Sequence, residues 1–138
     1  MSLRSVKVRD HMVRKPILVH PDTRLFEAVN AIIEHRISGV TVVNAEQRVA
    51  GMLSELDCLR AILSGVYYQQ EASIVDVGEH MVTDVECVTP DEDIIDVAQS
   101  MLDHKHRRRP VVDGDGRMVG QLTCRSILAA VKDFNNPR

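Results

Sequence analysis

The stretch TVVNAEQRVAGMLS at residues 41–54 decides the fold, because a second version of it, PVVDGDGRMVGQLT, stands at residues 110–123. In both versions two runs of mostly β-branched and aliphatic residues flank a short polar segment that ends in Arg. Two such runs around a polar turn are typical of a β-hairpin. The sequence therefore predicts two similar hairpins, one in each half of the chain.

The similarity extends well beyond the hairpins. Sliding the chain over itself by 69 residues aligns VRDHMV (8–13) with VGEHMV (77–82) and VHPD (19–22) with VTPD (88–91). Across residues 8–63 and 77–132, 15 of 56 positions are identical and no gap is needed. Self-similarity at one fixed offset indicates two copies of one structural unit.

Each copy predicts the same order of elements, β-α-β-β-α. A short apolar stretch (17–19, then 85–88) is closed by Pro-Asp, which is typical of a helix start. Apolar residues then recur at the helical spacing i, i+1, i+4, i+7, i+8, at 25, 26, 29, 32 and 33 and again at 94, 95, 98, 101 and 102. The hairpin follows, and a second short helix ends each copy, with Gly65 as the expected stop of the first.

These elements predict an α/β (α+β) fold made of two β-α-β-β-α repeats. We expect repeat 1 at 7–64, a linker at 65–76 and repeat 2 at 77–132. One copy has about 55 residues and would hold only a small core by itself. We therefore expect the two sheets to pack face to face about a pseudo-twofold axis, with helices outside and a ligand cleft between the repeats.

The composition predicts a soluble globular protein with an aliphatic core. Hydrophobic residues make up 44% of the chain and aromatic residues 3%, with no Trp, and the net charge is −3. The three cysteines lie far apart without a metal-ligand spacing, which favours reduced thiols, and Cys58 and Cys87 fit apolar core positions. The start of the chain lacks a secretory apolar run, and no stretch approaches the roughly 18 apolar residues of a membrane span. We therefore expect a cytoplasmic protein.

The paired motifs resemble the cystathionine-β-synthase (CBS) domain family. The residues that carry the resemblance are the two hairpin stretches, the HMV and Pro-Asp segments before them, and GMLSELD at 51–57. The likeness covers about residues 7–132 and resembles a stand-alone, bacterial-type tandem pair, a Bateman module. It implies a non-enzymatic regulatory module that binds AMP, ADP or ATP, or else S-adenosylmethionine or NAD. It also implies a disc-like homodimer and a regulated partner in trans.

The segment GMLSELD has two compatible interpretations. Ser54 and Asp57 have the spacing of a capping box at the start of the second helix. The family resemblance gives Asp57 the ribose hydroxyls of the ligand and places Ser54 near its phosphate. A carboxylate suits a ribose diol because it accepts charge-assisted hydrogen bonds from both hydroxyls, and the free N–H groups of a helix start suit a phosphate.

Repeat 2 departs from this pattern at the same segment. GQLTCRS at 120–126 keeps a hydroxyl at Thr123 but has Ser126 where repeat 1 has its carboxylate. Serine is too short and uncharged to clamp both ribose hydroxyls. Arg125 lies in the first turn of the helix, where a cation is unfavourable against the helix dipole unless an anion is near. A solvated Arg125 is the alternative.

The basic run HKHRRR at 104–109 divides into a structural and a ligand-binding part. His104 and Lys105 are expected to end a helix, where cations complement the dipole. By the family resemblance, Arg107 and Arg108 reach the phosphate of the nucleotide whose ribose is held by the other repeat. Repeat 1 has Ser38 and Gly39 in their place. Arg109 has no assigned role and is expected to face solvent or a dimer partner.

The adenine leaves little signal in the sequence. The resemblance suggests Ile17 and Val40, because the family holds the base between apolar side chains and backbone groups. Repeat 1 thus supplies the ribose carboxylate and repeat 2 supplies the phosphate cations. The sequence predicts one strong nucleotide site and a weak or vacant second one.

Three other functions were weighed against nucleotide sensing. The basic run at 104–109 could bind nucleic acid, but the pI is about 6.0 and aromatic residues that stack on bases are scarce. His104 and His106 are spaced i, i+2, which does not place them on one helix face for a metal. No nucleophile–base pair or Walker-type phosphate loop is visible, so we expect no catalysis and no metal.

Overall fold

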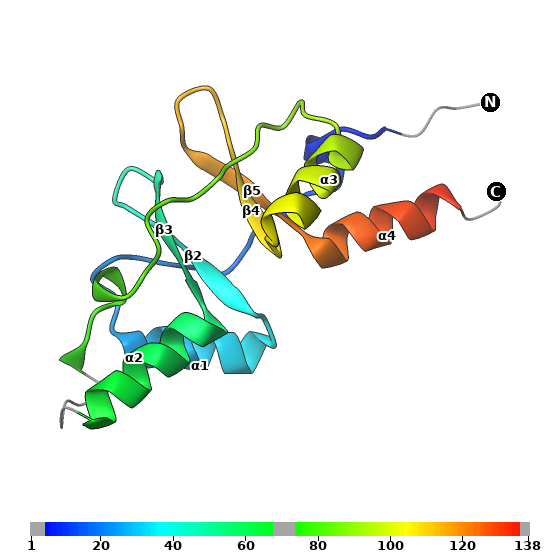
Figure 1. The fold of residues 1–138 in the computed structure, drawn as a ribbon. Coiled ribbons are helices and arrows are strands. Elements are labelled where there is room, and N and C mark those ends of the chain that lie inside the picture. Colours follow the sequence, from blue (N-terminus) through cyan, green and yellow to red (C-terminus); the bar gives the residue numbers. More distant parts are fainter. Residues whose placement is uncertain (1–4, 68–73, 136–138) are drawn as a thin grey trace. The chain divides into compact units, whose positions relative to one another are not determined.

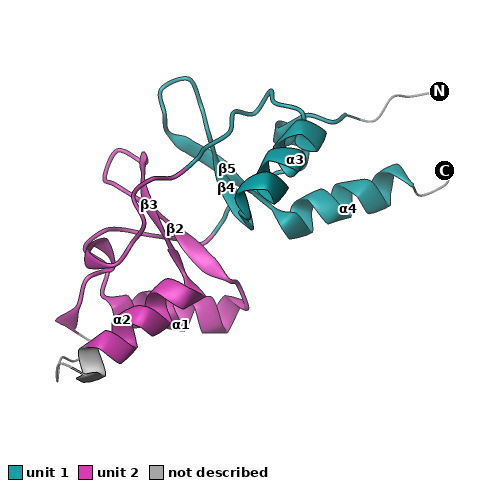
Figure 2. Cartoon of the chain, in the orientation of Figure 1, with its two compact units in different colours: residues 1–16, 86–138 teal, residues 17–85 magenta. Residues whose placement is uncertain are grey.

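The structure, a computed structural model, describes residues 5–67 and 74–135 (Figure 1). Within these ranges it has four α-helices and two small β-sheets, and the predicted mixed α/β class is confirmed. The chain forms two compact units (Figure 2): unit 1 is residues 1–16 with 86–138, and unit 2 is residues 17–85.

Unit 2 packs two helices on a three-stranded sheet. Its elements are β1 (Leu18–Val19), α1 (Leu25–His35), β2 (Gly39–Val43), β3 (Val49–Ser54) and α2 (Glu55–Tyr67). The central strand β2 pairs in parallel with β1 and antiparallel with β3, as the hairpin pattern predicts. Figure 1 shows α1 and α2 side by side, and the buried residues Leu25, Ala28, Ile32, Val42 and Leu53 belong to one core cluster beneath them.

Unit 1 repeats this arrangement. Its elements are α3 (Ile94–His104), β4 (Arg108–Val112), β5 (Met118–Thr123) and α4 (Cys124–Phe134). A parallel bridge between Val88 and Val111 takes the place of β1. The core cluster again consists of aliphatic residues from both helices and the hairpin: Val88, Ile94, Val97, Met101, Val111, Leu122, Ile127 and Ala130.

The opening segment of each repeat packs in the unit formed by the other repeat. The short helix η1 (Val8–Asp10) lies in unit 1, and Val13 exchanges two backbone hydrogen bonds with Gln121 of β5, at 2.8 and 2.9 Å. Its counterpart η3 (Val77–Glu79) lies in unit 2, and Val82 does the same with Met52 of β3. The compact units therefore do not coincide with the sequence repeats, whose expected bounds and face-to-face stacking stay predictions.

Two glycines of the hairpins make this packing possible. A Cβ atom on Gly51 would lie 2.7 Å from the carbonyl oxygen of Val82, and one on Gly120 would lie 2.6 Å from Sδ of Met12. At Gly51 the obstructing carbonyl is backbone, so glycine is required by the close approach of the opening segment, whereas at Gly120 the closest atom belongs to a side chain that can move.

The end of α2 differs from the prediction. The helix runs to Tyr67, so the expectation that Gly65 ends it is wrong. A glycine costs a helix interior only about 1 kcal/mol, which does not force a stop. Of the expected linker at 65–76, residues 68–73 lie outside the described residues.

Candidate functional site

The start of α2 holds the predicted capping box. The backbone N–H of Ser54 donates to Oδ2 of Asp57 at 2.9 Å, and the N–H of Asp57 donates to Oγ of Ser54 at 3.1 Å. The second carboxylate oxygen accepts from Arg60 at 3.1 Å. The Asp57 side chain is only 13% exposed, whereas that of Arg60 is 72% exposed.

This geometry leaves Asp57 able to bind a ligand. A carboxylate has about four acceptor positions, and the hydrogen bonds from Ser54 and Arg60 occupy one on each oxygen. The Arg60 side of the ion pair is exposed to solvent, and helical pairs at this spacing contribute only about 0.2–0.5 kcal/mol, so Arg60 yields readily to a competing donor. The structural role and the proposed ligand role of Asp57 are therefore compatible, as the sequence indicated.

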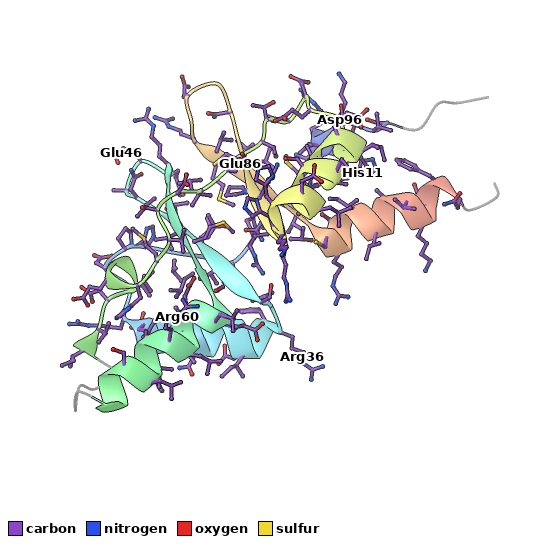
Figure 3. The ribbon with its side chains drawn as sticks, in the orientation of Figure 1. His11, Arg36, Glu46, Arg60, Glu86 and Asp96 are labelled. Atoms are coloured by element: carbon purple, nitrogen blue, oxygen red, sulfur yellow. The ribbon has the colours of Figure 1, made fainter. Side chains whose placement is uncertain are left out.

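A shallow open hollow in unit 2 lies beside this carboxylate. It is lined by Asp57, Arg60, Ala61, Ser64 and His80. Four of these residues follow the spacing i, i+3, i+4, i+7 along α2, and His80 comes from the end of η3. Sequence reasoning missed Arg60 (labelled in Figure 3) as a partner of Asp57, although its i+3 spacing is a signal that could have found it.

The start of α4 has the same capping box without the charge. The N–H of Thr123 donates to Oγ of Ser126 at 2.8 Å, and the N–H of Ser126 donates to Oγ1 of Thr123 at 3.0 Å. Ser126 thus replaces the capping function of Asp57 completely. What repeat 2 lacks is the carboxylate itself.

Unit 1 brings three of the predicted arginines to the start of α4. Arg108 pairs with Thr123 in the β4–β5 register, and the carbonyl of Arg107 accepts from the N–H of Cys124 at 3.0 Å. Arg125 is the second residue of the helix and is exposed, as is Arg107. The first turn of α4 carries no acidic residue.

The residues expected at the adenine lie in unit 2. Val40 is buried in the core cluster, and Ile17 is a half-buried residue packed against that cluster. The eight predicted site residues thus divide evenly between the units. Ile17, Val40, Ser54 and Asp57 lie in unit 2, and Arg107, Arg108, Thr123 and Arg125 lie in unit 1.

The structure overturns the expectation for Arg109. Its side chain is only 4% exposed, so it does not face solvent. Nη2 of Arg109 lies 2.6 Å from Oε2 of Glu86, and its Nε donates to Nδ1 of His106 at 3.2 Å. Burial follows from its place in β4, where it faces Leu122 in the strand register. One of the four fixed cations at 104–109 is therefore not on the surface, which weakens the nucleic-acid alternative.

The two histidines of the basic run lie closer together than their spacing indicated. His104 is the last residue of α3, and Lys105 caps the helix in the left-handed conformation, with φ 59°. The predicted helix end at these residues agrees with the structure. Because the chain leaves the helix here, the rings of His104 and His106 approach to 5.5 Å between centroids. Among the described residues no group of three or more His, Cys, Asp or Glu side chains could hold a metal ion.

Cys58 is buried in the core cluster of unit 2, whereas Cys87 is half-buried. Burial, followed by the charges of Asp57 and Glu55, raises the pKa of the Cys58 thiol to about 11. Burial also raises the pKa of Cys87, whereas Cys124 is exposed at the start of α4. A thiol with a raised pKa stays protonated at neutral pH and is a poor nucleophile.

No helix within the described ranges combines the length and apolar character that crossing a membrane requires.

Comparison with known proteins agrees with the geometry. The family model described as "CBS domain" matches twice, at residues 8–64 and 76–133. The inosine-5'-monophosphate dehydrogenase of Aquifex aeolicus is 31% identical over 126 residues, which are 91% of this chain but 24% of that enzyme. The chain thus spans about a quarter of the length of this curated relative.

Two solved structures are similar over nearly their whole length. CBSX2 from Arabidopsis thaliana, a CBS-pair protein solved in complex with AMP, has 26% identity and a TM-score of 0.83, covering 96% of this chain and 100% of that one. A putative acetoin utilization protein (AcuB) from Vibrio cholerae has 28% identity and a TM-score of 0.84, with coverages of 94% and 92%. With two family matches on two equivalent α/β units, this chain belongs to the CBS domain family and is a tandem CBS pair.

Proposed function

We propose that this CBS pair is a regulatory module that senses an adenine nucleotide (AMP, ADP or ATP) or a related adenosyl ligand, and that it catalyses no reaction. The observation that carries the proposal is the difference between two otherwise matching capping boxes. Asp57 holds a carboxylate where Ser126 holds a hydroxyl, although both cap their helices. The cap does not need the charge, so the charge at Asp57 is available for a ligand. The complex of CBSX2 with AMP supports the choice of ligand class.

In this proposal the residues of unit 2 hold the nucleoside. Asp57 accepts hydrogen bonds from the ribose hydroxyls, and its pair with Arg60 opens to make room. Ile17 and Val40 supply the apolar surroundings of the adenine. Ser54 lies beside the N–H groups at the start of α2, which favour a phosphate oxygen.

The residues of unit 1 are assigned to the phosphates. Arg107, Arg108 and Arg125 carry fixed positive charge to the start of α4, and Thr123 adds a hydroxyl. Guanidinium groups suit phosphate oxygens because their planar N–H donors match them in pairs. AMP and ATP differ in phosphate charge, so they would interact with these arginines to different extents.

Signalling then requires that the ligand bind one conformation or dimer geometry more tightly than another.

The exposed faces of the helices support a homodimer as the assembly that responds to the ligand. Large apolar side chains are exposed at equivalent positions of both units, with Ile33 68% and Leu102 75% exposed. Phe26 matches Ile95 and Leu59 matches Leu128 in the same way. Exposed apolar faces repeated on both helix pairs are typical of a self-association surface. A regulated protein bound in trans is part of the same proposal.

The substitution Asp57→Ser tests the proposal, because it copies the serine cap of repeat 2 into repeat 1. The capping hydrogen bonds are kept, so the free energy of unfolding should stay within about 0.5 kcal/mol of the parent value. The affinity for AMP and ATP, measured by calorimetric titration, should fall by at least about tenfold, since a charge-assisted bond to the ribose is lost.

Ser126→Ala is the matched control, since it removes the side-chain half of the α4 capping box, the hydrogen bond from the N–H of Thr123, and leaves both the Thr123 cap and Asp57 unchanged. It should lower stability by about 1 kcal/mol and leave nucleotide affinity unchanged. If Asp57→Ser bound AMP and ATP within about twofold of the parent protein, the proposed ribose role of Asp57 would be abandoned.

A further inference from the structure

Three positions change from apolar to charged or polar between the two repeats. In unit 2, Ile17, Ile37 and Val40 all belong to or pack against the core cluster. The residues 69 positions later are Glu86, His106 and Arg109. These are the three residues that the structure joins in unit 1.

The replacement forms one connected cluster, here called the charged triad (Glu86, His106, Arg109). The guanidinium of Arg109 is held between the carboxylate of Glu86, 2.6 Å away, and Nδ1 of His106, 3.2 Å away. The Arg109 side chain is 4% exposed, while Glu86 (labelled in Figure 3) is 49% exposed and connects the cluster to solvent. Nη2 of Arg109 makes no aligned hydrogen bond despite its short ion-pair distance.

The members of the charged triad depend on one another. Arg109 is the buried member of its ion pair, so removing Glu86 would leave a guanidinium charge that is costly to keep away from water. A neutral, flat ring that entered this place would have to move Glu86 or His106 away from Arg109. It would thus leave the guanidinium without compensation, whereas the counterparts of the triad in unit 2, Ile17, Ile37 and Val40, carry no charge.

We propose that the charged triad determines specificity by closing the base position of repeat 2 to adenine. This inference rests on the proposed function, in which Ile17 and Val40 surround the adenine in repeat 1. It is separate from the loss of the carboxylate at Ser126, because the triad acts on the base and Ser126 on the ribose. The pair therefore holds one adenosine ligand per chain, and restoring the ribose carboxylate alone does not create a second site.

Calorimetric titration with AMP tests this with three proteins. The parent and the variant Ser126→Asp should each bind one AMP per chain. The third protein combines Ser126→Asp with Glu86→Ile, His106→Ile and Arg109→Val. It should bind a second AMP, with an affinity at least about tenfold higher than that of Ser126→Asp alone for a second AMP. Because the triple exchange rebuilds a buried cluster, Arg109→Met in the Ser126→Asp background is measured beside it, and thermal melting confirms that each variant is folded.

The outcomes separate the two proposals. Two AMP molecules per chain on Ser126→Asp alone would overturn the triad's role, and so would a single AMP on both triad variants while they are folded. A folded parent protein that bound none of AMP, ADP, ATP or S-adenosylmethionine would instead contradict the proposed function. Ribose 5-phosphate serves as the probe without a base. Its affinity for Ser126→Asp should not change when the triad is exchanged. If the exchange raised the affinities for ribose 5-phosphate and for AMP equally, exclusion of the base by the triad would also be overturned.

Discussion

Replacing Gly51 by alanine tests the contact between a hairpin and the opening segment of the other repeat. The new Cβ atom would lie 2.7 Å from the carbonyl oxygen of Val82 and 2.7 Å from Sδ of Met81. The sulfur can rotate away, but the carbonyl is backbone and can move only with the segment around Val82. That movement strains the two hydrogen bonds between Val82 and Met52, which measure 2.8 and 2.9 Å.

The expected cost follows from these contacts. Overpacking of a tight site costs about 1–3 kcal/mol, and each of the two hydrogen bonds contributes about 1 kcal/mol. Gly51→Ala should therefore lower the free energy of unfolding by about 3 kcal/mol. Urea denaturation followed by circular dichroism measures this, and with a slope of about 2 kcal/mol per molar the midpoint should fall by about 1.5 M.

Two other glycines provide the comparison. A Cβ atom on Gly114 would meet no heavy atom within 4 Å, so Gly114→Ala should change stability by less than about 0.5 kcal/mol. At Gly120 the closest atom is Sδ of Met12, and the Val13 carbonyl lies at 3.0 Å. Gly120→Ala should therefore cost less than Gly51→Ala, and adding Met12→Ala should relieve part of the clash. Equal midpoints for Gly51→Ala and Gly114→Ala would refute the packing of residues 81–82 against β3.

Two further predictions concern the thiols and the exposed helix faces. At neutral pH a thiol-specific reagent should modify Cys124 first and Cys58 last; rapid modification of Cys58 in the folded protein would contradict its burial. Because the folded pKa of Cys58 is about 11, above an unfolded value near 8.5, its contribution to stability is complete below about pH 8.5 and is lost as the pH rises toward 11. Cys58→Ala should accordingly flatten the alkaline fall in unfolding free energy, and an unchanged slope would argue against the shift. The double variant Ile33→Glu, Leu102→Glu should have the mass of one chain in sedimentation equilibrium, and Glu34→Gln is the control. A parent protein that is already monomeric would contradict the homodimer.

Local and repeated patterns made much of the fold predictable. The two hairpins form at the predicted stretches, although β2 begins at Gly39 and β4 at Arg108, each two residues earlier, and the capping box at Ser54 and Asp57 follows from a spacing of three residues. Such features depend on neighbours within a few positions, which a single sequence displays. Because the two halves are similar in sequence, each feature predicted for one repeat could also be predicted for the other.

Contacts between distant residues were not predictable in the same way. The pairing of Val13 with Gln121 produces no pattern in either segment, since an edge strand binds through backbone groups that every residue has. Arg109 had no assigned role and was expected to face solvent or a dimer partner, whereas an arginine that finds an ionic partner can be buried. Its partner Glu86 lies outside the basic run, and only the comparison of the three triad positions with their counterparts connects the two.

The exchanged opening segments give the molecule an order of assembly during synthesis. The last strand partner of unit 2, Val82, leaves the ribosome well before Gln121, on which Val13 must pair. Unit 2 can therefore close while unit 1 is still being made, because domains fold as their residues emerge. Residues 5–16 precede unit 2 in the chain, yet they pair only after Gln121 has been made. Throughout that interval the backbone of Val13 lacks the partner that it has in the folded chain, and an unpaired strand edge is a template for pairing with another chain. Pairing between two chains at this segment therefore competes with folding of the single chain until Gln121 has been made.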